Sequence, residues 1–379
     1  MGKRGAEMKK RSKVLAVLLC LAMALSVGCG SEKAEEKTDK ADLAPQESAD
    51  EPQEEEEEPD EKLVWIQEAS AQYNASKVRG NVKETVYTKQ DGSTYTQKYV
   101  TTFDTDRQVI MEQYFSEDNA YTNFYTKEGD SEYMYTQGYN TDPNTGEMTE
   151  IPVKVSVNRE IDSYGSYSAM IDNENTELFE SNDRVEYTDV KVTEEGEEEI
   201  DGTAVVKLKV DYTKKAVGEE KISRESVLGQ YKWTEEDVAL LDGMSDAVDA
   251  YVEESNLAAE DRMNNAKSST DIYYLSAEDH SLVRFTTEGE TEGISASVKT
   301  FWNMSSKLDW LKDLVAGGMG TEEAKSYVNE NFITDDSAEA AESYTSVTTY
   351  VTGDSCEQIA ELPADARMIT LEQYENGEY

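Results

Sequence analysis

A series of short runs rich in tyrosine, threonine and valine, each ending at a turn signal, constrains the fold most strongly. The first two runs, residues 78–88 and 94–103, are separated by Asp91 and Gly92, a dipeptide typical of a tight hairpin turn. Further runs of the same kind cover residues 107–115, 120–126, 132–137 and 151–157. Because consecutive hairpin strands pair with their neighbours, these runs predict one continuous antiparallel meander.

Residues 63–75, just ahead of these runs, show the spacing of an amphipathic helix. Their apolar side chains recur every three or four positions, at Leu63, Ile66, Ala69 and Tyr73. Such a stripe is buried against a neighbouring element, so we expect this N-terminal helix to pack on the sheet.

The second half of the chain contains further strand patterns. Residues 185–193 and 203–212 are expected to pair across an acidic turn that runs from Glu194 to Gly202. The other expected strands are residues 271–275, 282–287, 294–304, 344–351 and 368–373.

Helices are expected between these strands. Thr234, with Asp237 three residues later, is typical of a helix start, and about 20 helical residues should follow it, interrupted weakly by Gly243. Shorter helices are expected at residues 306–315 and 322–332, and residues 161–171 fit a short helix without requiring one. The chain is therefore expected to have an α+β fold, with a single sheet domain over residues 63–379.

The hairpin from Tyr273 to Phe285 carries a resemblance to a known family. Its strands are aromatic and aliphatic, and the second one reads Leu-Val-Arg-Phe after the turn. Together with the N-terminal helix and the meander, it resembles the half-barrel of LolA-type lipoprotein carriers and LppX-type surface lipoproteins, over residues 63–304. The resemblance implies a curved, half-barrel-like antiparallel sheet with helices on one face and a lipid or acyl chain on the concave side. Another antiparallel α+β domain, or two smaller domains, remain alternatives.

The beginning of the chain has the pattern of an export signal. Basic residues from Lys9 to Lys13 precede an apolar run, Val14 to Leu25, which is too short to span a bilayer. Small residues then lead to Cys29, as in the bacterial lipoprotein signal, although Ser26 stands where that family usually has leucine. The resemblance implies that residues 1–28 are removed and that Cys29 is lipidated, for example with palmitate. We therefore expect an anchor on the extracytoplasmic face of the cell membrane.

The segment between this cysteine and the first helix, residues 29–62, is acidic and poor in apolar residues. Five consecutive glutamates, Glu54 to Glu58, lie between two prolines. Such a composition cannot offset its ordering entropy, so the segment is predicted to be a disordered tether. Translation from Met1 and from Met8 are both compatible with the signal.

Charge excludes several kinds of partner. The chain has 81 acidic and 36 basic residues, a formal net charge of −45. Nucleic acid and anionic lipid surfaces would both be repelled, so neither is an expected partner beyond the lipid anchor. The protein partner and the oligomeric state are left open by the sequence.

Few residues could support catalysis. Of three cysteines, Cys20 lies in the signal and Cys29 is the lipidation site, so Cys356 would be the one thiol left. The single histidine, His280, falls in a predicted turn and is expected to be exposed. The loop Gly317 to Thr321 is interpreted as a helix end followed by a threonine N-cap rather than an anion site, and Asp142 to Glu147 as a turn rather than a calcium loop. No catalytic residue, cofactor or metal site is predicted, and an acid-catalysed wall hydrolase is a distant third hypothesis.

Tyrosine is abundant, with 23 residues against 7 phenylalanines. A tyrosine-rich concave face would suit an amphipathic ligand, because the ring is apolar and the hydroxyl is polar. The alternative is that tyrosine and threonine are simply favourable strand residues on a solvated face. The sequence therefore predicts a non-enzymatic envelope lipoprotein that binds a lipid or another hydrophobic ligand through residues not yet identified. The other hypothesis is an envelope scaffold or protein-interaction module without a small-molecule ligand.

Overall fold

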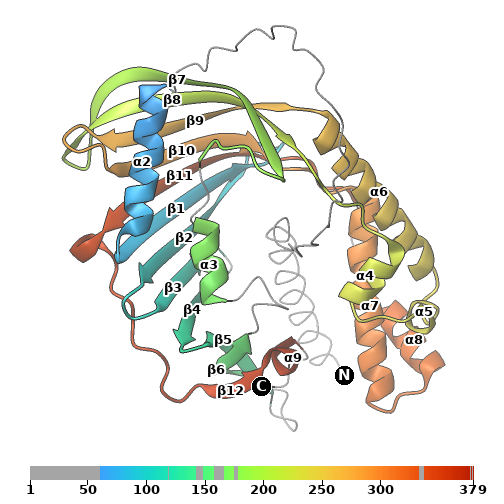
Figure 1. The fold of residues 1–379 in the computed structure, drawn as a ribbon. Coiled ribbons are helices and arrows are strands. Elements are labelled where there is room, and N and C mark those ends of the chain that lie inside the picture. Colours follow the sequence, from blue (N-terminus) through green and yellow to red (C-terminus); the bar gives the residue numbers. More distant parts are fainter. Residues whose placement is uncertain are drawn as a thin grey trace, which may run out of the picture.

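One large sheet organises the chain in the computed structural model, which describes residues 60–117, 119–141, 148–157, 166–174, 178–332, 337–375, 377 and 379. Within these residues, the sheet has 12 strands in the order β12-β6-β5-β4-β3-β2-β1-β11-β10-β9-β8-β7. Figure 1 shows it curved and open, with β7 and β12 at its two edges. This confirms the expected α+β fold built on a curved sheet.

The strands follow the predicted meander closely in the first half of the chain. Their bounds are β1 (Val78–Thr88), β2 (Thr94–Asp104), β3 (Val109–Phe115), β4 (Ala120–Glu128), β5 (Ser131–Thr141) and β6 (Met148–Val157). The second half adds β7 (Val185–Ile200), β8 (Thr203–Ala216), β9 (Lys267–Ser276), β10 (Leu282–Glu290), β11 (Ser343–Thr352) and β12 (Arg367–Thr370). Neighbouring strands are antiparallel, except that β12 pairs parallel to β6.

Strand β11 joins the two halves of the sheet. It pairs with β1 on one side and with β10 on the other, so residues 343–352 lie beside residues 78–88. The chain then passes to the far edge, where β12 is followed by the short helix α9 (Leu371–Glu375). The expected strand at residues 368–373 is therefore partly wrong, because its second half is helical.

Helices α2 (Glu61–Ala75) and α3 (Tyr167–Glu174) lie on the same face of the sheet (Figure 1). Ile66 and Ala69 of α2 are buried in a cluster with side chains of β7, β8 and β9. Tyr167 of α3 packs with Phe103 and Ile110. The N-terminal helix is as predicted but starts two residues earlier, at Glu61, because the Asp60 side chain accepts a hydrogen bond from the Lys62 amide and caps it.

The remaining helices form a bundle beside the sheet (Figure 1). They are α4 (Arg224–Gln230), α5 (Glu235–Val238), α6 (Met244–Asn264), α7 (Ala296–Ala316) and α8 (Thr321–Asn331). A separate 3-10 turn, η1 (Gly353–Ser355), follows β11. The bundle has its own core, in which Trp233, Met244, Val248, Phe301 and Leu308 are buried together.

The expected strand at residues 294–304 is wrong, because residues 296–304 belong to α7 and only Ile294 makes a β-bridge, to Glu339. The valine and aromatic residues there favour a strand locally, but Phe301, Ser305, Leu308 and Leu311 are all buried at helical spacing. The Ser295 side chain caps the helix by accepting a hydrogen bond from the Val298 amide. Burial against α6 therefore overrides the local strand preference.

The helix expected after Thr234 is two helices. Thr234 and Asp237 form the predicted capping box, but α5 ends at Val238. Gly243 then takes a left-handed conformation, with φ 83°, and α6 begins after it. A left-handed residue cannot continue a right-handed helix, so Gly243 breaks the helix instead of interrupting it weakly.

Two predicted turns also differ from the structure. Glu194 to Ile200 extend β7, and the turn to β8 is only Asp201 and Gly202, both with positive φ. Helix α8 is capped by Gly320, and Thr321 is its first residue rather than its N-cap. The predicted turn at Asp142 to Glu147 lies outside the described residues.

Candidate ligand-binding face

The face of the sheet that carries α2 and α3 is called here the helix-covered face. Side chains alternate between the two faces along a strand, and cross-strand partners share a face. Tyr73 of α2 contacts Tyr350 of β11, whose cross-strand partner is Asn81 of β1. The register then places these strand tyrosines on the helix-covered face: Tyr87, Tyr95, Tyr99, Tyr114, Tyr121, Tyr125, Tyr212, Tyr273, Tyr344 and Tyr350.

Six of these tyrosines form two rows across neighbouring strands. The first row is Tyr344, Tyr87 and Tyr95, with ring centroids 6.1 Å and 4.9 Å apart. The second row is Tyr99, Tyr114 and Tyr121, with centroids 4.8 Å and 5.1 Å apart. The rows line the helix-covered face along β11, β1, β2, β3 and β4.

The phenol groups of Tyr99 and Tyr121 remain protonated at neutral pH. Burial raises the pKa of Tyr99 and Tyr121, and neighbouring phenol groups and Glu112 raise it further. The face therefore offers hydroxyl groups that both donate and accept hydrogen bonds, on apolar rings.

A carboxyl group lies next to the second tyrosine row. Glu112 of β3 is paired in register with Asn123 of β4. The Tyr125 hydroxyl lies 3.5 Å from Glu112 Oε1, at the limit of a hydrogen bond. Burial raises the pKa of Glu112, and the Tyr125 contact lowers it only in part.

A second acid on this face lies beneath α2. Asp271 of β9 is buried, with 6% of its surface exposed, and accepts a 3.0 Å hydrogen bond from the Tyr212 hydroxyl. Burial raises the pKa of Asp271. This acid is enclosed by the core that α2 covers, whereas Glu112 lies outside that core.

Arg79 is a buried cation on the same face, with 1% of its surface exposed. Its guanidinium carbon lies 4.5 Å from the centroid of the Phe103 ring, and Nη1 donates to the Ser76 carbonyl oxygen at 3.3 Å. These contacts hold the end of α2 to the sheet, so we interpret Arg79 as structural.

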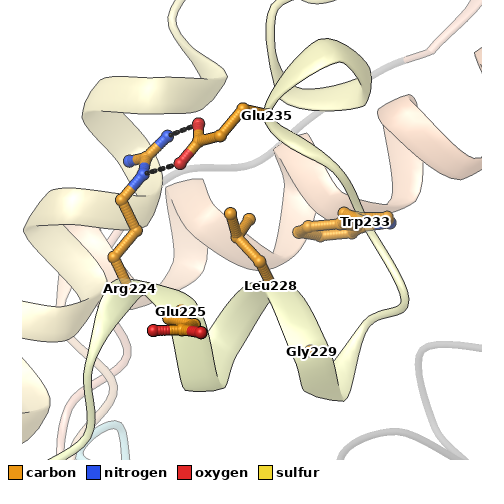
Figure 2. A pocket seen from close by; sticks show the side chains of 6 residues that line it. All are labelled: Arg224, Glu225, Leu228, Gly229, Trp233 and Glu235. Atoms are coloured by element: carbon orange, nitrogen blue, oxygen red, sulfur yellow. Dashed lines mark hydrogen bonds and ion pairs between the residues drawn. The ribbon is translucent and has the colours of Figure 1, made fainter.

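The surface also has an open hollow of about 580 Å³ in the helical bundle, lined by Arg224, Glu225, Leu228, Gly229, Trp233 and Glu235. Figure 2 shows the Arg224 guanidinium paired with the Glu235 carboxylate at its rim. The two N–O distances are 2.9 Å and 2.8 Å, and Asp249 accepts a third bond at 2.7 Å. The Arg224 charge is thus already compensated, and the hollow lies away from the tyrosine rows.

The structure places the residues that the sequence singled out in separate locations. Cys29 lies outside the described residues, so its lipidation stays a prediction. Cys356 follows η1, where burial raises the pKa of its thiol and makes it less nucleophilic. His280 is half-buried rather than exposed, because its ring stacks on Trp65 at 4.0 Å. Among the described residues, no group of three or more possible metal ligands is found, and no described helix is long and apolar enough to cross a membrane.

Sequence reasoning missed Glu112 and Asn123 as neighbours. Both are polar residues in strands whose alternate positions are aromatic or apolar, and this is the signal that could have identified them. Their pairing depends on the register of β3 and β4, which the turn between these strands sets.

Three solved structures show a low similarity to this chain. Lipoprotein LppX from Mycobacterium tuberculosis has 9% sequence identity and a TM-score of 0.31, over 79% of this chain and 97% of that chain. An outer membrane lipoprotein-sorting protein domain from Vibrio parahaemolyticus has 7% identity and a TM-score of 0.19, over 78% and 94%. A DUF1329 family protein from Desulfovibrio piger has 9% identity and a TM-score of 0.19, over 78% and 94%.

The two kinds of protein that the sequence resembles are thus among the structures found. TM-scores this low support no conclusion about a ligand. No protein-family model matches the chain, and no curated protein matches it.

Proposed function

We propose that this protein is a non-enzymatic lipoprotein, anchored to the extracytoplasmic face of the cell membrane through Cys29, that binds a lipid or another amphipathic ligand. The ligand lies against the tyrosine rows on the helix-covered face. The observation that carries this proposal is the concentration of strand tyrosines on that one face of a curved, open sheet. Ring surfaces contact alkyl chains while hydroxyl groups bind a polar head, which is the chemistry that an amphipathic ligand requires.

The alternative is an envelope scaffold or protein-interaction module that uses the free edge of the sheet. Strand β7 is such an edge. Its C-terminal half carries five exposed glutamates: Glu194, Glu195, Glu197, Glu198 and Glu199. Charged edge strands resist pairing with another strand, because pairing would remove water from the charged side chains or bring like charges together. This edge therefore favours the ligand-binding proposal over strand addition.

The test uses the mature chain with Cys29→Ser, so that its own acyl anchor does not contribute. We expect acyl species to be found bound to the protein by native mass spectrometry after purification from cells. We also expect a fluorescent monoacylglycerol, whose head group is uncharged, to bind, and Tyr121→Ser to weaken its binding severalfold because it removes one ring of the second row. Tyr274→Ser is the matched control, since Tyr274 is a half-buried strand tyrosine whose position alternates with Tyr273 and so lies on the opposite face. A protein that carries no acyl species and does not bind the uncharged acyl probe would refute the proposal.

A further inference from the structure

The cluster around Glu112 offers oxygen acceptors in an aromatic setting. Glu112 lies in register between Thr101 of β2 and Asn123 of β4. Two residues further along these strands, and therefore on the same face, lie Tyr99, Tyr114 and Tyr121. They form the second tyrosine row. The Tyr125 hydroxyl lies 3.5 Å from Glu112 Oε1.

One acceptor of this cluster has its hydrogen-bonding capacity unused. Asn123 Oδ1 is buried and has no hydrogen-bond partner among the described residues. An unpartnered buried amide oxygen destabilises the folded protein, so its presence on a candidate binding face calls for a donor that is supplied from outside the chain.

The carboxyl group has no strong partner either. Burial is the largest influence on the pKa of Glu112. Its one hydrogen-bond donor is the Tyr125 hydroxyl, which lies 3.5 Å away. The nearest basic residues on β1 do not compensate it: the Arg79 guanidinium contacts Phe103 and Ser76, and Lys83 is exposed in register with Tyr99. A buried carboxylate is stable when a cation pairs with it.

We propose that Glu112, Asn123 and the second tyrosine row bind the organic ammonium head group of a cationic amphiphile. The carboxylate of Glu112 supplies the countercharge, Asn123 Oδ1 accepts a hydrogen bond or a polarised C–H contact, and the tyrosine rings contribute cation–π attraction. This inference rests on the proposed function, because the alkyl part of the ligand would occupy the rest of the tyrosine face.

The charge of the whole protein favours the same ligand. A net charge of −45 attracts cations and repels anions at long range. An anionic head group would also meet the Glu112 carboxylate directly, and a neutral head group would leave that carboxyl without a countercharge. An ammonium group is the head group that compensates the acid and suits the rings.

The experiment compares three amphiphiles with the same dodecyl chain, by calorimetric titration into the mature chain carrying Cys29→Ser, below their micelle concentrations. The ligands are dodecylammonium, whose N–H groups can donate to Asn123 Oδ1, a neutral dodecyl glycol ether and dodecanoate. We expect the ammonium ligand to bind about tenfold more tightly than the neutral one. Glu112→Gln should abolish this preference.

Glu84→Gln is the matched control, because Glu84 is exposed on β1 and alternates with Lys83, so it removes the same charge from the opposite face. It should leave the preference unchanged. Equal binding of the three ligands, or an equal loss in Glu84→Gln, overturns the ammonium site but leaves the proposed function standing. Binding of none of them overturns the proposed function itself. If Glu112→Gln does not fold, as judged by circular dichroism, Asn123→Leu tests the same preference, and it too must reduce it.

Discussion

The backbone amide and the hydroxyl of Ser168, in the first turn of α3, both donate hydrogen bonds to the carboxylate of Glu132 on β5. The amide bond is 3.1 Å long, and Lys127 Nζ lies 3.8 Å from the same carboxylate. Burial alone would raise the pKa of Glu132, but these hydrogen bonds lower it overall. A buried acid on the sheet thus holds α3 on the helix-covered face.

Ser168→Ala is expected to destabilise the protein by about 1–3 kcal/mol, because it removes one hydrogen bond to a buried carboxylate. The free energy of unfolding should be measured in urea at neutral and acidic pH. Because the folded-state pKa of Glu132 is lowered, its stabilisation is present above the unfolded value of about 4.3 and is lost as pH falls through the folded pKa. The difference in the free energy of unfolding between wild type and Ser168→Ala should therefore become smaller at acidic pH. Ser245→Ala, at an exposed position of α6, should change little at either pH.

Glu112→Gln is expected to stabilise the protein at neutral pH in the absence of ligand. The folded-state pKa of Glu112 is raised by burial, so ionisation costs more in the folded state than in the unfolded state. This loss of stability is absent below the pKa that Glu112 has in the unfolded state. It grows as pH rises through the pKa that Glu112 has in the folded state. Urea unfolding should show wild type and variant converging near pH 4 and separating at higher pH. A variant that is less stable than wild type at neutral pH would contradict this prediction.

Phe301→Ala is expected to destabilise the helical bundle by about 3–5 kcal/mol. The Phe301 side chain is completely buried, and its ring stacks on Tyr251 at 4.2 Å, between α6 and α7. Chemical denaturation followed by tryptophan fluorescence would report the loss, since Trp233 lies in the same cluster. Leu257→Ala is the control on α6, because Leu257 is 58% exposed and its truncation should cost about 0.5 kcal/mol or less.

Cys29→Ala is expected to abolish lipid attachment, because the thiol is the acceptor of the acyl group. The variant should leave the membrane fraction or accumulate with its signal uncleaved, and it should incorporate no radiolabelled palmitate. Membrane fractionation and labelling measure these outcomes. Equal labelling of wild type and variant would refute lipidation at Cys29.

Hairpin positions were predictable because the signals are local. Asp91 and Gly92 lie in the loop between β1 and β2, and Gly92 takes the positive φ, 82°, that such turns require. Residues 294–304 were misjudged because Val298, Phe301 and Trp302 favour a strand by composition. Their helical burial depends on α6, more than 30 residues earlier in the chain, which no local pattern reports.

The sequence by itself determined the apolar stripe of α2 and most of the strands, because each rests on neighbouring residues. It also predicts export and lipidation at Cys29. Tertiary structure alone decided that β11 lies between β1 and β10, and that the tyrosines gather on the face beneath α2 and α3. It also decided that Glu112 and Asn123 lie side by side. The reason is physical: strand pairing and facing depend on register and on contacts between distant segments, and a one-residue shift would move every side chain to the other face.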